Sequence, residues 1–228
     1  MNRYCNWSEF GYLSSNGRCF DIGNTGSAAL SRYRTTGDPF SGSTDPYSAG
    51  NGSLMRLAPM FYHPDRARIR HYSGESSRTT HGAPECIDAC RLFREMLARA
   101  LDGASKEEIL CPHDTAELPS VAIQAIARGG YRDKTADDIS GSGYVVHCLE
   151  AALWCFLTTD SFPAAILQAA NLGEDADTTA AVCGQIAGAH YGESGIPAHW
   201  LERLTMREEI ASLADRLYSA GRAPASYS

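Results

Sequence analysis

Residues 144–157 read YVVHCLEAALWCFL, the most hydrophobic helical pattern in the chain. The stretch is apolar on nearly every side, which is typical of a helix buried in the centre of a bundle. Its polar exceptions, His147 and Glu150, need partners if they lie in the core. The glycine-rich residues 140–143 predict a loop from which this helix starts. We therefore expect a fold built around residues 144–157.

Helical patterns lie on both sides of this stretch. Apolar residues recur at spacings of three and four over residues 85–101. Further helices are expected over residues 25–35, 54–60, 64–72, 105–110, 119–128, 162–170 and 180–189, with one or two over 196–218. Residues 1–20 are rich in turn residues, and residues 38–53 and 73–83 are expected as polar loops. Since no stretch shows strand-like alternation, we predict an all-α, single-domain, orthogonal multi-helix bundle over residues 1–228.

The composition limits the function classes. The 228 residues have a hydrophobic content of 43% and a net charge of −7, with no basic run, which argues against binding to a nucleic-acid backbone. No apolar run is long enough to span a bilayer, and the N-terminus lacks a signal-peptide pattern. The eight cysteines form no Cys-x-x-Cys pair. We expect reduced thiols in a cytoplasmic protein without a membrane association.

Residues 171–179 read NLGEDADTT and concentrate oxygen-bearing side chains between two apolar runs. Two carboxylates and two hydroxyls, those of Asp175, Asp177, Thr178 and Thr179, are hard oxygen ligands that suit Mg²⁺ or Ca²⁺. Gly173 is in the place where a helix ends, and Asp175 or Asp177 suits the N-cap of the next helix. The stretch alone therefore leaves two interpretations open, a metal site and a helix cap.

Two glycine-rich segments each precede a predicted helix. Gly50, Asn51, Gly52 and Ser53 end the long loop over residues 38–53, and residues 141–143 precede the central helix. Glycines at a helix start let backbone N–H groups approach an anion closely. An ordinary turn is the alternative for residues 50–53.

Five segments, taken together and in order, resemble the ADP-ribosylglycohydrolase family. They read GRCFDIGNT (17–25), STDPYSAGNGSLMR (43–56), THG (80–82), GSGYVV (141–146) and GEDADTT (173–179), and the resemblance extends over about residues 7–218. It implies an all-α fold that holds a binuclear Mg²⁺ (or Mn²⁺) site. It also implies cleavage of the N- or O-glycosidic bond between ADP-ribose and a protein side chain or a small molecule that contains ADP-ribose.

The resemblance assigns roles to individual residues. Asp175, Asp177 and Thr178 match metal ligands, and Asp21 and Asn24 match a polar pair near the scissile bond, with Asp21 as the catalytic candidate. The substrate-binding candidates are Asn24, Gly50, Asn51, Gly52, Ser53, His81, Gly141, Ser142, Gly143 and Tyr144.

The sequence also departs from the family pattern. Family members carry an earlier segment with a Thr-Asp-Asp-Thr-like metal motif, which does not occur before Met1. We therefore expect an N-terminally incomplete domain. Three explanations are open: a truncated product or a late start site, a natural non-hydrolytic relative, or a second chain that supplies the segment. We favour the truncated product or late start site. We expect weak metal binding by this chain alone. The alternative to a hydrolase is a catalytically inactive ADP-ribose binder or a structural, crystallin-like relative.

Overall fold

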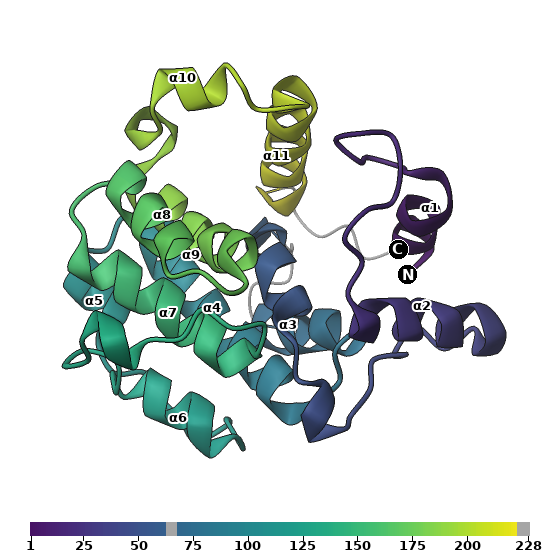
Figure 1. Ribbon diagram of the computed structural model, residues 1–228, viewed down its shortest axis with the longest axis horizontal. Coiled ribbons are helices and arrows are strands. Elements are labelled where there is room, and N and C mark those ends of the chain that lie inside the picture. Colours follow the sequence, from purple (N-terminus) through teal and green to yellow (C-terminus); the bar gives the residue numbers. More distant parts are fainter. Residues whose placement is uncertain (63–67, 223–228) are drawn as a thin grey trace.

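The computed structural model describes residues 1–62 and 68–222, and in this part of the chain the elements are helices, with no strand. The all-α prediction is confirmed. In chain order (Figure 1) they are α1 (Asn2–Phe10), α2 (Asn24–Thr36), η1 (Pro46–Ser48), η2 (Asn51–Arg56), η3 (Ala58–Tyr62), α3 (Ile69–Arg78), α4 (Pro84–Leu101), α5 (Lys106–Leu110), α6 (Val121–Ala127), η4 (Ala136–Asp138), α7 (Val145–Thr158), α8 (Phe162–Asn171), α9 (Ala176–Tyr191), η5 (Glu193–Gly195), α10 (Ala198–Leu201) and α11 (Arg207–Arg222).

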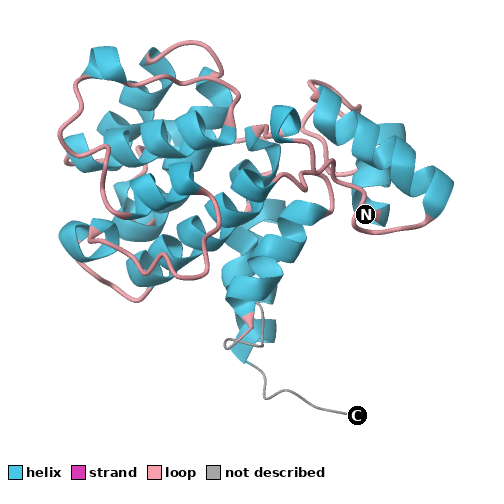
Figure 2. Cartoon of the chain, turned by 90° about the horizontal axis from the view of Figure 1, so that it is seen from below, coloured by secondary structure: helices cyan, strands magenta, loops and turns pink. Residues whose placement is uncertain are grey.

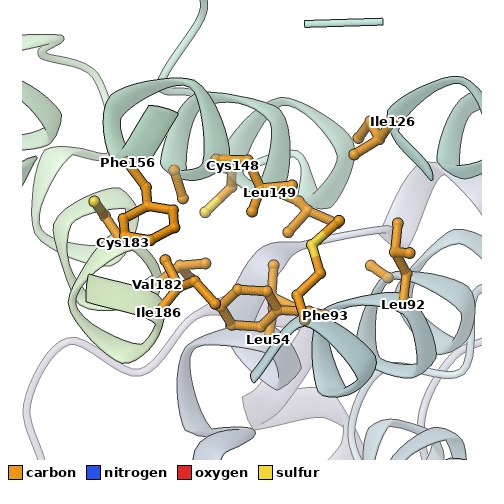
Figure 3. Packing of buried hydrophobic residues seen from close by; sticks show 14 of the residues in the cluster. Leu54, Leu92, Phe93, Ile126, Cys148, Leu149, Phe156, Val182, Cys183 and Ile186 are labelled. Atoms are coloured by element: carbon orange, nitrogen blue, oxygen red, sulfur yellow. The ribbon is translucent and has the colours of Figure 1, made fainter. Parts of the chain in front are cut away.

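Helix α7 is the predicted central helix. Leu149, Leu153 and Phe156 are fully buried on it, and α4, α9 and η2 pack around it. Figure 3 shows side chains of α4, α6, α7, α9 and η2 meeting in one apolar cluster. Burying each large apolar side chain stabilises the fold by about 1.5–3 kcal/mol, so this cluster holds the bundle together.

The small-residue face of α9 lets α8 pack closely against it. A Cβ atom on Gly184 would lie 3.4 Å from Ile166, and one on Gly188 would lie 3.8 Å from Phe162. Ser161 starts α8 by accepting a hydrogen bond from the backbone N–H of Ala164. The α8–α9 turn therefore has a fixed position, and the acidic stretch follows directly from it.

Helices α1 and α2 lie beside the main bundle in both views (Figures 1 and 2). No residue of α1 is buried, and α2 buries only Ala29 and Leu30. The two helices contact each other through an ion pair between Arg34 and Glu9 at 2.7 Å. The N-terminus of α2 points back toward η2, which brings its first residues to the cavity described below.

Several local predictions need correction. Residues 73–83 were expected as a polar loop, but α3 continues to Arg78, because Ser73, Gly74 and Ser77 form a small buried face against α4. Residues 1–20 were expected as turns but contain helix α1, whereas the one or two helices expected over 196–218 are confirmed as α10 and α11. Of the helix expected over 64–72, residues 64–67 lie outside the described part.

Two further predictions concern the central helix and its environment. His147 is exposed and does not lie in the core. Its ring nitrogen Nδ1 lies 2.9 Å from the Ser142 hydroxyl. Glu150 is partly buried and has the partner that burial requires, the amine of Lys134 at 2.7 Å. Among the helices of the described residues, none is both long enough and apolar enough to cross a membrane.

Candidate functional site

A cavity of about 500 Å³ lies between the N-terminus of α2, helix η2 and the start of α9. This volume is within the range of small-molecule sites in proteins. Its wall takes residues from six separate segments of the sequence. The predicted site residues among them are Asp21, Asn24, Gly50, Asn51, Gly52, His81, Gly143, Asp175 and Thr178.

The two glycine-rich segments lie side by side in this wall. Gly50 and Tyr144 form an isolated antiparallel bridge. The backbone N–H of Asn51 donates to the carbonyl of Gly143 at 3.0 Å, and that of Val145 donates to Ala49 at 3.0 Å. Residues 92 to 96 positions apart in the sequence therefore form one backbone surface, to which Gly50 and Gly143 add no side chains.

Asp175 is held at the cavity by two contacts. Its Oδ2 accepts a hydrogen bond of 2.7 Å from Nδ2 of Asn51, and its backbone N–H donates to the carbonyl of Gly141 at 3.0 Å. Asp175 stands at the N-cap position of α9, but its carboxylate makes no cap hydrogen bond. The side chain of Asp175 is therefore directed to Asn51 and the cavity rather than to the helix backbone.

Asp21 and Asn24 line the cavity from the segment that leads into α2. Asp21 has a φ of 50°, a left-handed conformation that aspartate tolerates better than most residues. It precedes Gly23, the N-cap of α2, and Asn24, its first residue. Both Asp21 and Asn24 are exposed, so their polar groups are accessible from the cavity.

His81 forms part of the cavity wall and is only 6% exposed. Burial, reinforced by the charge of Arg56, lowers the pKa of His81 to about 4, so the ring is neutral at physiological pH. A Cβ atom on Gly52 would lie 2.8 Å from Cε1 of His81, closer than real Cβ contacts. The absence of a side chain at Gly52 is therefore what allows the histidine ring to pack against the loop.

The remaining predicted residues lie outside this cavity. Ser53 is buried and accepts hydrogen bonds from Ser77 and Cys90, Gly141 is buried behind Asp175, and Asp177 is exposed in the first turn of α9. Tyr144 lines a neighbouring cavity of about 640 Å³, which shares Thr25, Gly50 and Gly143 with the first. Its ring packs edge-on against His147, 5.0 Å between centroids.

The structure adds residues that the sequence analysis did not single out. Tyr4, Trp7, Arg56 and Thr80 line the cavity. Arg56 lies within the quoted 43–56 segment and Thr80 within the 80–82 segment, so the motifs contained both positions without indicating their contacts. Tyr4 and Trp7 come from α1, where no motif marked them.

The donor atoms near the start of α9 suit a hard divalent cation in type. Asp175, Asp177 and Thr178 provide two carboxylates and a hydroxyl, the oxygen ligands that Mg²⁺ prefers. Within residues 1–62 and 68–222, no three His, Cys, Asp or Glu side chains gather closely enough to hold a metal ion. Of these three candidate ligands, Asp175 and Thr178 line the cavity and Asp177 does not.

Comparison with known proteins relates this arrangement to a family. Residues 1–226 match the family model described as ADP-ribosylglycohydrolase. The chain is 45% identical over 214 residues to the ADP-ribosylarginine hydrolase Tri1 of Serratia proteamaculans, covering 93% of this chain and 58% of that protein. It is 32% identical over 201 residues to the ADP-ribosyl-[dinitrogen reductase] glycohydrolase of Rhodospirillum rubrum, covering 84% and 63%.

A solved structure extends the likeness to three dimensions. A chain of an "ADP-ribosylglycohydrolase-related protein complex" superposes with a TM-score of 0.79 at 40% sequence identity, covering 87% of this chain and 69% of that one. The chain thus spans about three fifths of the length of the curated relatives it matches.

Proposed function

Because this chain belongs to the ADP-ribosylglycohydrolase family, we propose that it hydrolyses the glycosidic bond that attaches ADP-ribose to a modified protein side chain. The observation that carries the proposal is the convergence of the family-like segments on one cavity. Asp21, Gly50, His81, Gly143 and Asp175 come from five such segments, and all line the same 500 Å³ space. Segments this far apart in sequence meet there because the fold brings them together.

The two adjacent cavities suit an elongated ligand such as ADP-ribose. They share Gly50 and Gly143, so a ligand that crosses the paired glycine backbone reaches both. We propose that the scissile end occupies the cavity with Asp21 and Asp175, and that the nucleotide end lies toward Tyr144. A glycine backbone without side chains permits the close approach that a diphosphate needs.

Asp21 is the proposed catalytic residue. Cleaving the bond develops positive charge at the ribose carbon, and a nearby carboxylate stabilises that charge or accepts a proton from the attacking water. Asn24, the first residue of α2, supplies a donor and an acceptor for the departing group. His81 contributes a neutral ring at the cavity wall.

We propose Mg²⁺, with Mn²⁺ as the substitute, as the cofactor, held in part by Asp175, Asp177 and Thr178. When bound, a divalent cation orients ribose hydroxyls and lowers the pKa of an attacking water. The hydrogen bond from Asn51 keeps Asp175 turned to the cavity before any ion arrives. Because these residues supply only part of an octahedral shell, we expect weak Mg²⁺ binding by this chain alone.

The relatives guide the choice of substrate. Two proteins that are 45% and 44% identical to this chain are named ADP-ribosylarginine hydrolases, so arginine-linked ADP-ribose is the first linkage to test. We further propose a cytoplasmic location, which is supported by the eight cysteines, all free and five of them buried.

The test is release of ADP-ribose from arginine-linked and serine-linked substrates with and without Mg²⁺. Release that requires Mg²⁺ and is lost in Asp21→Asn and Asp177→Asn supports the proposal. The matched control is Asp137→Asn, an exposed aspartate in the first turn of η4 that lines neither of the two cavities. This control retains the activity of the wild type.

Two results would contradict the hydrolase proposal. ADP-ribose binding without release from either linkage indicates the non-hydrolytic binder instead. Neither binding nor release indicates a structural relative on the same scaffold. The expectation that a further segment completes the metal site stays a prediction, and assays on a longer chain that contains such a segment test it.

A further inference from the structure

A chain of hydrogen bonds leads from Arg56 to the ring of His81. Nη2 of Arg56 lies 2.6 Å from Oγ1 of Thr80, and the same Oγ1 lies 2.8 Å from Nδ1 of His81. Thr80 and His81 are buried, with 7% and 6% of their surfaces exposed. Arg56 is itself held in place, because Nη1 donates to the hydroxyl of Tyr4 at 2.7 Å and the guanidinium lies 4.8 Å from the centre of that ring.

The donor and the acceptor of each hydrogen bond between Arg56, Thr80 and His81 follow from a count of protons. A guanidinium can only donate, so the Thr80 oxygen accepts from Arg56. The hydroxyl proton of Thr80 then needs an acceptor, and within the described residues its other polar neighbour is Nδ1 of His81. Nδ1 is therefore the acceptor and carries no proton. In a neutral imidazole the proton consequently sits on Nε2.

The protonated nitrogen lies at the cavity. A Cβ atom on Gly52 would lie 3.0 Å from Nε2, and one on Gly50 would lie 3.5 Å from it. Within the described residues, Nε2 has no hydrogen-bond partner in the protein, although the side chain is more than nine-tenths buried. Nε2 is not one of the fully buried atoms that lack a partner, so it is accessible from the cavity, where an acceptor oxygen of a ligand can bind it.

We infer that Thr80 and Arg56 are positioning residues that fix His81 as a neutral ring with its Nε2 proton offered to an acceptor oxygen of the bound ligand. The inference deepens the proposed function, on which the ligand part rests: the acceptor is an oxygen of ADP-ribose. A neutral donor suits this place because an imidazolium would leave the Thr80 hydroxyl without an acceptor. The low pKa of His81, caused first by burial and then by the charge of Arg56, agrees with a neutral ring.

The tautomer is measured by ¹⁵N NMR on the full chain with labelled histidines, first without any ligand. His81→Gln identifies the His81 signals among those of the seven histidines. His113 is an internal reference, because its Nε2 lies 3.0 Å from the carbonyl of Ile109 and far from Thr80 in sequence. We expect a pyridine-type Nδ1 and a pyrrole-type Nε2 for His81 at neutral pH, in the wild type and in Thr80→Ser.

Thr80→Val removes the hydroxyl and keeps the shape of the side chain. We expect His81 to become a mixture of tautomers in this variant while the His113 signals stay unchanged. Titration calorimetry with ADP-ribose should show about 5- to 10-fold weaker binding by Thr80→Val, the size of one lost hydrogen bond, and binding by Thr80→Ser close to that of the wild type.

Three results overturn the inference: a proton on Nδ1 in the wild type, an unchanged tautomer in Thr80→Val, or equal ADP-ribose affinity despite a changed tautomer. The proposed function fails separately. If the wild type shows the expected tautomer and its loss in Thr80→Val but does not bind ADP-ribose, the positioning of His81 by Thr80 stands and the assignment of the ligand is wrong.

Discussion

The contact between Asn51 and Asp175 joins η2 to the start of α9 across the cavity, and its loss should be measurable. Nδ2 of Asn51 donates to Oδ2 of Asp175 at 2.7 Å, and Asn51 is only 7% exposed. Asn51→Asp keeps the size of the side chain but replaces the donor with an acceptor. Two carboxylates then face each other where one hydrogen bond had been.

The expected magnitude has two parts. A hydrogen bond to a charged group contributes about 1.5–3 kcal/mol, and this is lost in Asn51→Ala as well. In Asn51→Asp, repulsion between two charges about 4 Å apart adds up to about 4 kcal/mol at an effective dielectric constant near 20, reduced by water in the cavity. We expect Asn51→Ala to lower the free energy of unfolding by about 2 kcal/mol and Asn51→Asp by about 3–5 kcal/mol.

The assay is urea unfolding followed by circular dichroism, at neutral pH and low salt. The decisive variant combines Asn51→Asp with Asp175→Asn, which reverses the direction of the hydrogen bond and removes the repulsion. We expect the exchanged pair to be more stable than Asn51→Asp by about 2 kcal/mol or more. The reasoning is refuted if Asn51→Asp costs less than about 1 kcal/mol, or if the exchanged pair is no more stable than Asn51→Asp.

Three further predictions follow from packing and protonation. Phe93→Ala should lower the free energy of unfolding by about 3–5 kcal/mol, because Phe93 is fully buried, whereas Phe10→Ala, 74% exposed, should change it by about 0.5 kcal/mol or less in thermal unfolding. Gly52→Ala should weaken ADP-ribose binding about tenfold or more in calorimetry, because its Cβ would lie 2.8 Å from Cε1 of His81. Because the pKa of His81 is lowered from 6.5 to about 4 in the folded chain, the free energy of unfolding should fall by about 3 kcal/mol as the pH falls from 6.5 to 4, measured by urea unfolding.

Each of these predictions has a control and a contradicting outcome. Gly184→Ala is the control for Gly52→Ala, because its Cβ would lie at an ordinary contact distance of 3.4 Å from Ile166. Equal losses of ADP-ribose affinity in both variants would contradict the steric argument. For the pH dependence, the unfolded chain binds a proton on His81 in this window and the folded chain does not, so stability falls as pH falls. An unchanged pH dependence in His81→Gln would show that other groups cause it. Equal effects of Phe93→Ala and Phe10→Ala would contradict the assigned core.

The fold followed from the sequence where one pattern dominated. Residues 144–157 correspond to the central helix α7, because a helix that is apolar on nearly every side buries most of its surface. The prediction failed at residues 73–83, where composition indicated a loop. Ser73 and Ser77 are polar, yet they are buried in α3 because small side chains let α3 lie close to α4. Such a preference depends on the neighbouring helix and is invisible in the local sequence.

The sequence predicted which segments form the candidate site but not which side chains contact one another there. The acidic turn after α8 and the two glycine-rich segments stood out through residue type alone. The roles of Thr80 and Arg56 did not, because a hydrogen bond between a helix end and a distant arginine has no sequence signature.

The sequence by itself determined the helical class, the buried central helix and the oxygen-rich turn at residues 171–179, because periodicity and residue chemistry act locally. Only the tertiary structure decided that the carboxylate of Asp175 turns to Asn51 instead of capping α9. It also decided that Nε2 of His81 meets the glycines at 50 and 52. Both contacts lie beside the bridge between residues 50 and 144, which backbone atoms make and no side-chain pattern encodes.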